Sequence, residues 1–305
     1  MKYIDTHCHL HDKALHSKLD FTILKMKEDK IIGVTIGTDY ETSIEAKALA
    51  ENNENIFYTI GVHPCDDEMA TFDENKFEKL LSDRCVAIGE CGLDYYYFKK
   101  NKIKNTLERE KDQRILIYNI DEEIDRQQRL FIQQIAFAKK HKLPLMLHGR
   151  PSARDKIDNP TGMDAYEDMI YILEHASLPP APSSVGGETQ KIHGNVHFFV
   201  GNIEIAKRFM DLGFDFSFGG VITVTHDYDD VLRYIPIEHI HAETDSPYVS
   251  PKDKDGKRVS VPNTPLNIKI IIAKIAEIKR LPLECVEQQL LINAERLYCI
   301  KSEQQ

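Results

Sequence analysis

Short apolar runs rich in Val, Ile, Tyr and Phe alternate with longer amphipathic stretches along most of the chain. Such runs, bounded by polar or glycine-containing segments, are typical of buried β-strands. Eight strands are predicted in this way, at residues 3–9, 31–37, 56–63, 86–94, 144–148, 196–200, 214–218 and 239–245.

The stretches between these runs have the spacing of helices. ETSIEAKALAENN follows the second strand, and EIDRQQRLFIQQIAFAKKHK follows the fourth. In the latter, a stripe with a period near 3.6 residues is predicted to face the core. Its members are Leu130, Ile132, Ile135, Phe137 and Ala138. Two further helical runs, at 265–280 and 283–298, close the chain, so one helix is left over after the eight strands are paired with helices.

Eight strand–helix alternations predict an α/β fold, a single (β/α)8 TIM-type barrel with an extra C-terminal helix. An open, doubly wound sheet remains an alternative, because periodicity does not show whether a sheet closes. No linker divides the 305 residues, so we expect one barrel domain over 1–305.

Two stretches interrupt the rhythm. In residues 99–123, 13 of 25 residues are charged, which predicts a disordered surface insertion after the fourth strand. Residues 177–191, SLPPAPSSVGGETQK, predict a flexible connection before the sixth strand.

Composition indicates the cell compartment and the kinds of partner that we expect for this protein. No apolar run approaches the length of a membrane span, and the first residues lack the pattern of a signal peptide. Six cysteines without a C-x-x-C pair indicate reduced thiols. We therefore expect a soluble monomer in the cytoplasm or the nucleus, with no membrane association and no obligate protein partner. A net charge of −10 excludes a general basic surface for nucleic acid, so a polyanionic substrate would need a local cationic site.

The first predicted strand and the three residues after it have the sequence YIDTHCHLHD, which is unusually rich in groups that are costly to bury. Residues two apart share a face of a strand, so His7 and His9 project together while Cys8 points away. A single such histidine is more often a core residue that is hydrogen-bonded to backbone. A pair aimed at one point is half of a metal site.

The other strand ends supply the missing half. In a barrel, working groups gather at the C-terminal ends of the strands. The polar residues there are His7, His9, His63, Glu90, His148, His197 and Asp245. Several imidazoles, a carboxylate able to bridge, and a second carboxylate able to accept a proton are what a two-metal hydrolytic site requires.

At these positions the sequence resembles a known family. The motifs, in chain order, are DTHCHL, IGVHP, AIGECGLDYY, LPLMLHGR, NVHFFVG, GFDFSFGGVIT and ETDSPY. They resemble, over nearly the whole chain, the successive motifs of the TatD family of metal-dependent deoxyribonucleases, which belongs to the amidohydrolase-like barrels. The resemblance implies a TIM-type barrel with two divalent ions per chain, Zn²⁺, Mn²⁺ or Mg²⁺, that hydrolyses the phosphodiester bonds of DNA.

The resemblance also implies individual roles. His7, His9 and Asp245 would bind one ion, His148 and His197 the other, and Glu90 would bridge the two. His63 would contact the phosphate, with a helix-capping or packing role as the alternative. For catalysis we expect Glu90, Asp245 and His63 to act together, with Asp245 accepting the proton from the attacking water. Arg150, just after His148, could contact phosphate too, although a surface role is equally compatible with its position.

Other polar residues are not expected to bind a metal ion directly. His11 is predicted in a solvated loop, and His193 at the wrong end of its strand. Glu243 is predicted to orient a ligand imidazole. The family's cysteine and hydroxyl positions are Phe198 and Val200 here, and Thr264 replaces a frequent acid.

Two other functions are compatible with such a site. An amidohydrolase or lactonase acting on a small molecule would use the same metals to polarise a carbonyl. Those relatives commonly bridge their metals with a modified lysine from the fourth strand, where this chain has Glu90. An inactive scaffold is disfavoured, because no expected ligand is missing.

Overall fold

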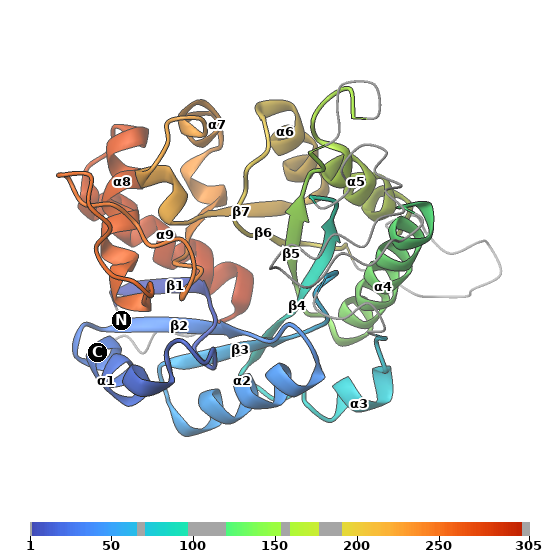
Figure 1. Ribbon diagram of the computed structural model, residues 1–305, viewed down its shortest axis with the longest axis horizontal. Coiled ribbons are helices and arrows are strands. Elements are labelled where there is room, and N and C mark those ends of the chain that lie inside the picture. The colour runs from blue at the N-terminus through green and yellow to red at the C-terminus, as the bar shows by residue number, and fades with distance from the viewer. Residues whose placement is uncertain (1, 66–70, 97–119, 154–158, 177–190, 301–305) are drawn as a thin grey trace, which may run out of the picture.

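The computed structural model describes residues 2–65, 71–96, 120–153, 159–176 and 191–300. Eight parallel strands form one sheet in which β1 to β8 follow one another in chain order, and helices surround them (Figure 1). The strands are β1 (Tyr3–Cys8), β2 (Ile31–Ile36), β3 (Ile56–Ile60), β4 (Cys85–Asp94), β5 (Leu145–Arg150), β6 (Gly194–Val196), β7 (Phe214–Phe218) and β8 (Ile240–Ala242).

The sheet closes between its first and last strands. Cys8 forms a parallel bridge with Ser246, just beyond β8. The His9 N–H donates to the Ser246 carbonyl at 2.7 Å, and the Asp245 N–H donates to the His7 carbonyl at 2.9 Å. The predicted eight-stranded barrel is therefore confirmed, and its closing seam lies directly at the predicted metal ligands.

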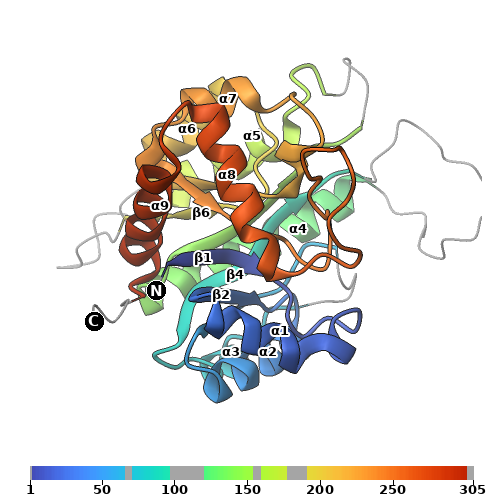
Figure 2. The ribbon, with the colours of Figure 1, turned by 90° about the vertical axis from the view of Figure 1, so that its left-hand side faces the viewer.

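The α-helices of the described residues follow the predicted alternation. They are α1 (Leu19–Glu28), α2 (Tyr40–Asn52), α3 (Glu74–Glu78), α4 (Ile120–His141), α5 (Asp164–Ala176), α6 (Ile203–Leu212), α7 (Asp229–Tyr234), α8 (Ile268–Lys279) and α9 (Leu283–Tyr298). The last is the predicted extra helix. It packs against β1 and β8, and Figure 2 shows it beside α8.

Strand boundaries were predicted less well than strand positions. β6 begins at Gly194 and ends at Val196 rather than covering 196–200. A side chain at Gly194 would collide with the Leu145 carbonyl, so glycine here permits close strand pairing although it reads as a strand breaker. β3 and β8 also end early, so His63, His197 and Asp245 lie on the loops that follow their strands.

Helix α4 corrects two predictions. It begins at Ile120, so residues 120–123 belong to the helix and not to a charged insertion; residues 97–119 lie outside the described part of the chain. Ile132, predicted in the core stripe, is 50% exposed, whereas Phe131 is buried. The predicted connection 177–191 also lies outside the described residues, except for Lys191.

The core has two parts. The larger cluster joins the strands to the surrounding helices, with every residue of β1, β2, β4 and β7 buried. The smaller joins Ile4, Ile32 and Met146 of the sheet to Leu297 and Tyr298 of α9. The extra helix thus completes the core of the barrel. None of the helices within the described ranges is long and apolar enough to cross a membrane.

Candidate metal centre

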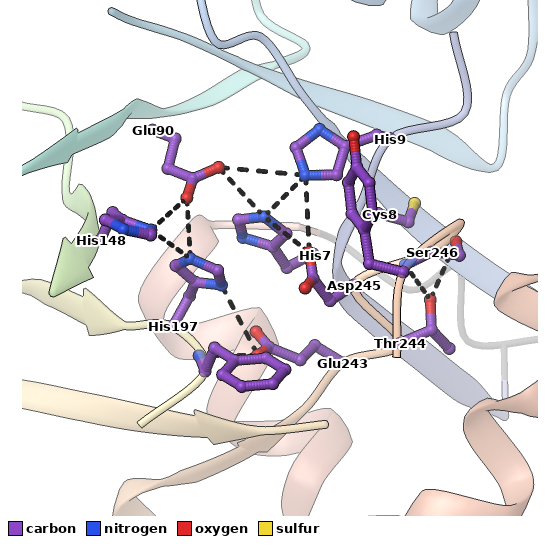
Figure 3. Close-up of polar contacts among 12 residues, drawn as sticks. His7, Cys8, His9, Glu90, His148, His197, Glu243, Thr244, Asp245 and Ser246 are labelled. Carbon is purple, nitrogen blue, oxygen red and sulfur yellow. Dashed lines mark hydrogen bonds and ion pairs between the residues drawn. The ribbon is translucent and has the colours of Figure 1, made fainter. Parts of the chain in front are cut away.

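The structure brings the six predicted metal ligands together at the C-terminal end of the barrel. Figure 3 shows their side chains pointing toward one another from the strands and the segments that follow them. His7 comes from β1, Glu90 from β4 and His148 from β5. His9 and His197 come directly after β1 and β6, and Asp245 lies in the loop after β8.

Glu90 lies between two pairs of imidazoles. Its Oε1 is 2.8 Å from His148 Nδ1 and 2.8 Å from His197 Nε2. Its Oε2 is 3.4 Å from His7 Nε2 and 3.9 Å from His9 Nε2. Each carboxylate oxygen therefore faces one histidine pair, which is the arrangement that a bridging carboxylate requires.

The spacing of the ring nitrogens fits metal binding. His7 Nε2 and His9 Nε2 are 3.3 Å apart, as are His148 Nδ1 and His197 Nε2. Two nitrogens bound to one tetrahedral ion at about 2.05 Å would be about 3.3 Å apart. The ligand atoms of His7, His9 and Glu90 lie within 4.8 Å of one another, and so do those of Glu90, His148 and His197. Both groups can therefore hold a metal ion.

Asp245 completes the first group. Its Oδ1 is 3.5 Å from His9 Nε2 and 3.7 Å from His7 Nε2. The Asp245 side chain is 14% exposed, whereas that of Glu90 is 5% exposed. Of the two carboxylates, Asp245 is the one that is more open to solvent.

The pKa values of Glu90 and His148 are both shifted in the direction that favours their charged forms. Burial alone would raise the pKa of Glu90, but the imidazoles of His197 and His7 hold it well below its usual range. Burial would lower the pKa of His148, but Asp94 and Glu90 raise it to about 9. A fully buried carboxylate that stays ionised needs positive charge beside it, which divalent ions would provide.

His63 lies beside the cluster, and its Nε2–H group faces the cluster. The Cys65 N–H donates to His63 Nδ1 at 3.1 Å, so the ring proton of the neutral histidine is on Nε2. His63 Nε2 is 3.8 Å from Glu90 Oε1. A protonated Nε2 does not bind a metal, but it can donate a hydrogen bond to an anion in the site.

Asp94 is a site residue to which the sequence analysis assigned no role. Its Oδ2 is 3.0 Å from His148 Nε2, and its Oδ1 accepts the Tyr96 N–H. A carboxylate on one imidazole nitrogen fixes the ring so that the other nitrogen can bind a metal. The available signal was its position, four residues after Glu90 on the same face of β4.

Glu243 is placed near the imidazole of His197. Its Oε1 is 3.6 Å from His197 Nδ1 and accepts the Phe198 N–H at 2.7 Å, while its Oε2 accepts the Ser217 hydroxyl. Glu243 is fully buried. The expectation that it orients a ligand imidazole remains a prediction, with the two groups close enough for that role.

Asp5 holds the segment that carries Asp245. Its two carboxylate oxygens accept the backbone N–H and the hydroxyl of Thr244. Asp5 is fully buried, and burial raises its pKa to about 8. These bonds join the middle of β1 to the loop after β8, so the first and last strands position Asp245 together.

The remaining predicted residues lie further from the cluster. Arg150 ends β5, and its guanidinium lies 3.6 Å from the centre of the Tyr96 ring. His11 is half-buried rather than solvated, with its ring 6.0 Å from that of His9. His193 precedes β6 and so lies at the N-terminal end of its strand, as predicted.

Comparison with known proteins adds independent information. Residues 4–299 match the family described as TatD related DNase. A protein of Bacillus subtilis described as "Uncharacterized metal-dependent hydrolase YabD" is 30% identical over 301 residues, covering 97% of this chain and 98% of that protein. A protein of Vairimorpha ceranae described as "Putative deoxyribonuclease TATDN1 homolog" is 28% identical over 303 residues, covering 97% and 94%.

Solved structures show the same fold. The crystal structure of YjjV, a TatD homologue from Escherichia coli K12, superposes with a TM-score of 0.74 at 25% identity, covering 98% of this chain and 99% of that one. An amidohydrolase from Saccharomyces cerevisiae, described as uncharacterised, has a TM-score of 0.71 at 17% identity, covering 98% and 100%. These likenesses extend over the whole barrel.

Proposed function

The chain belongs to the TatD family of metal-dependent hydrolases, and from this premise we propose that it is a deoxyribonuclease that hydrolyses the phosphodiester bonds of DNA with two divalent ions. The observation that carries the proposal is the position of Glu90. Its two oxygens face separate histidine pairs, His7 with His9 and His148 with His197.

The ligand assignment follows from these distances. His7, His9 and Asp245 would hold one ion and His148 with His197 the other, with Glu90 shared. Ligation by four imidazoles suits Zn²⁺ or Mn²⁺ better than Mg²⁺, which prefers oxygen ligands. Bound ions would supply Lewis acidity, which lowers the pKa of the attacking water and stabilises negative charge on the phosphate.

The chain's own groups supply the remaining steps. The Asp245 carboxylate, which lies beside His9 and is more exposed than Glu90, would accept a proton from the attacking water. His63 donates its Nε2 proton in a hydrogen bond to a nonbridging phosphate oxygen. Arg150, at the rim, attracts the DNA backbone.

A local positive charge would reconcile an acidic protein with a polyanionic substrate. Two divalent ions would carry about +4 against about −2 from the ligand carboxylates Glu90 and Asp245, so the side of the ions that faces the substrate would be positive although the chain carries −10 overall. DNA would then be attracted to the pocket and repelled elsewhere, which favours binding at the cleavage site.

The test is digestion of end-labelled single- and double-stranded oligonucleotides before and after chelation. We expect cleavage to be lost in excess chelator and regained with Mn²⁺, Zn²⁺ or Mg²⁺. A His7→Ala/His9→Ala variant purified in parallel controls for nuclease from the expression host. Full activity in excess chelator, or equal activity of that variant, would contradict the proposal.

A further inference from the structure

Helix α4 turns two glutamines toward the barrel, at positions where an amphipathic helix normally places apolar residues. Gln127 is 1% exposed and Gln134 is fully buried. They are seven residues apart and so lie on the same face, among Leu130, Phe131 and Ile135. Burying an amide is costly unless it is hydrogen-bonded, so each should have specific partners.

Gln127 pairs with both backbone groups of Asp94. Its Oε1 accepts the Asp94 N–H at 2.9 Å, and its Nε2 donates to the Asp94 carbonyl at 3.1 Å. The recorded pairing of β3 with β4 ends at Ile60 with Ile88, well before Asp94. The side chain of Gln127 thus forms the two hydrogen bonds to the Asp94 backbone that a longer β3 would otherwise form.

Gln134 likewise forms hydrogen bonds with both backbone groups of Val62. Its Oε1 accepts the Val62 N–H at 2.8 Å, and its Nε2 donates to the Val62 carbonyl at 2.9 Å. Close packing accompanies this contact, because a Cβ at Gly61 would lie 2.9 Å from Gln134 Oε1 and 2.6 Å from the Gly89 backbone. Val62 immediately precedes His63, which faces the metal centre.

The two clamped residues lead to different parts of the site. Asp94 bonds His148 Nε2 and so fixes the ring whose Nδ1 faces Glu90. Val62 fixes the chain at His63, whose Nε2 points toward the cluster. Helix α4 therefore supports His148, a predicted metal ligand, through Gln127, and it supports His63, which can donate a hydrogen bond to an anion, through Gln134.

We propose that Gln127 and Gln134 are separate positioning residues, the first for metal binding through Asp94 and His148, and the second for phosphate binding through Val62 and His63. The proposal rests on the proposed function for the identity of the anion. Its two halves can be separated, because each glutamine should affect one binding property and spare the other.

The experiment compares Gln127→Met and Gln134→Met, in which methionine keeps the side-chain length but removes both hydrogen-bonding groups. Gln133→Met, on the exposed face of the same helix, is the matched control. Affinity for Zn²⁺ is measured by competition with a chromogenic chelator. Affinity of the metal-loaded protein for inorganic phosphate is measured by calorimetry.

We expect Gln127→Met to weaken Zn²⁺ binding by about tenfold or more, as the loss of support for a ligand imidazole does. Gln134→Met should weaken phosphate binding by about fivefold, the effect of one loosened hydrogen bond. Its Zn²⁺ affinity, and both affinities of Gln133→Met, should stay within about twofold of wild type. Equal losses of Zn²⁺ affinity in both buried variants, or none in Gln127→Met, would overturn the proposal.

Asp94→Asn provides a second route if Gln127→Met does not fold, since it leaves the backbone contacts of Gln127 in place. It should weaken Zn²⁺ binding at least as much as Gln127→Met. Combining the two changes should add little, because both act through His148; additive losses would refute that path. Both readouts are independent of DNA cleavage, so a wild-type protein without nuclease activity would refute only the proposed function.

Discussion

Each end of the barrel carries a cluster in which histidines contact a buried carboxylate, and the two clusters differ in what balances the negative charge. At the C-terminal end, ring nitrogens and carboxylate oxygens face one another around shared space (Figure 3). At the N-terminal end, Asp215 of β7 accepts from His239 Nδ1 at 2.7 Å, from His241 Nε2 at 3.0 Å and from Arg296 at 2.6 Å.

The difference lies in the cation. Arg296, from α9, places a permanent positive charge on Asp215 and also donates to the Glu238 carbonyl. Within the described residues, no lysine or arginine pairs with Glu90 or Asp245. Residue types alone therefore do not identify a metal site. In this protein we interpret the cluster that is paired with Arg296 as structural and the cluster without such a partner as the one that could hold an added cation.

Glu90→Gln should give the largest effect on this comparison. The change keeps the size of the side chain but removes the charge shared by the two histidine pairs. Metal content should fall to one ion per chain or lower, and kcat should fall by about 100-fold or more, as on loss of one preorganised charge contact. Metal analysis and oligonucleotide digestion measure both effects.

The fold should survive this change. The apolar core does not include the cluster, so Glu90→Gln should still fold. Without added metal its melting temperature should be lower than that of wild type, because the imidazoles of His197 and His7 stabilise the ionised Glu90. Wild-type turnover with two ions still bound in Glu90→Gln would contradict the bridging role.

Asp215→Asn should lower the stability of the fold and leave metal binding and turnover nearly unchanged. Loss of the charge-assisted hydrogen bonds from His239, His241 and Arg296 should lower the free energy of unfolding by about 1.5–3 kcal/mol, which thermal unfolding would record as a lower melting temperature. Turnover at 25 °C should stay within about threefold of wild type, since the site lies on a separate layer of side chains. Loss of metal binding in this variant would show that the two clusters are coupled through β7 and β8.

Acid unfolding should reveal the same contact. Burial would raise the pKa of Asp215, but the hydrogen bond from His241 and the other cationic neighbours hold it below the ordinary value of 3.8. A depressed carboxyl pKa stabilises the fold above the unfolded pKa, and this stabilisation is lost as the pH falls below it. The stability difference between wild type and Asp215→Asn, measured by urea unfolding, should thus shrink as the pH falls below 3.8. A difference that grows below this pH would be inconsistent with this account.

The sequence predicted the barrel and the gathering of its polar strand ends, because both follow from rules that act along the chain. Strand number follows from apolar runs, and the meeting of His7, Glu90 and His148 follows from parallel strands ending at one face. The roles of individual residues came from resemblance to a family. The structure places the predicted ligand atoms close together.

What the sequence could not predict depends on contacts between distant segments. Gln127 and Gln134 interrupt the apolar stripe of α4, and a polarity pattern does not distinguish an amide that holds a strand end from one that faces solvent. The same ambiguity put the exposed Ile132 in the core. Asp94 was visible at the end of β4, but only its distance from His148 Nε2 reveals what it holds.

The smallest effect concerns the two arginines that stand beside the two clusters. Arg296 is paired with Asp215, whereas Arg150 stacks on Tyr96 and has no carboxylate partner among the described residues. Its charge is therefore available to a phosphate. In Arg150→Gln, we expect KM for an oligonucleotide to rise about fivefold with kcat unchanged. The slope of the logarithm of the binding constant against the logarithm of the salt concentration should become shallower by about 1, because one phosphate contact is lost. Arg296→Gln is the matched control, which should lower the melting temperature and leave KM unchanged. If Arg150→Gln has the KM and salt dependence of wild type, the stacked guanidinium supports the end of β5 and does not contact DNA.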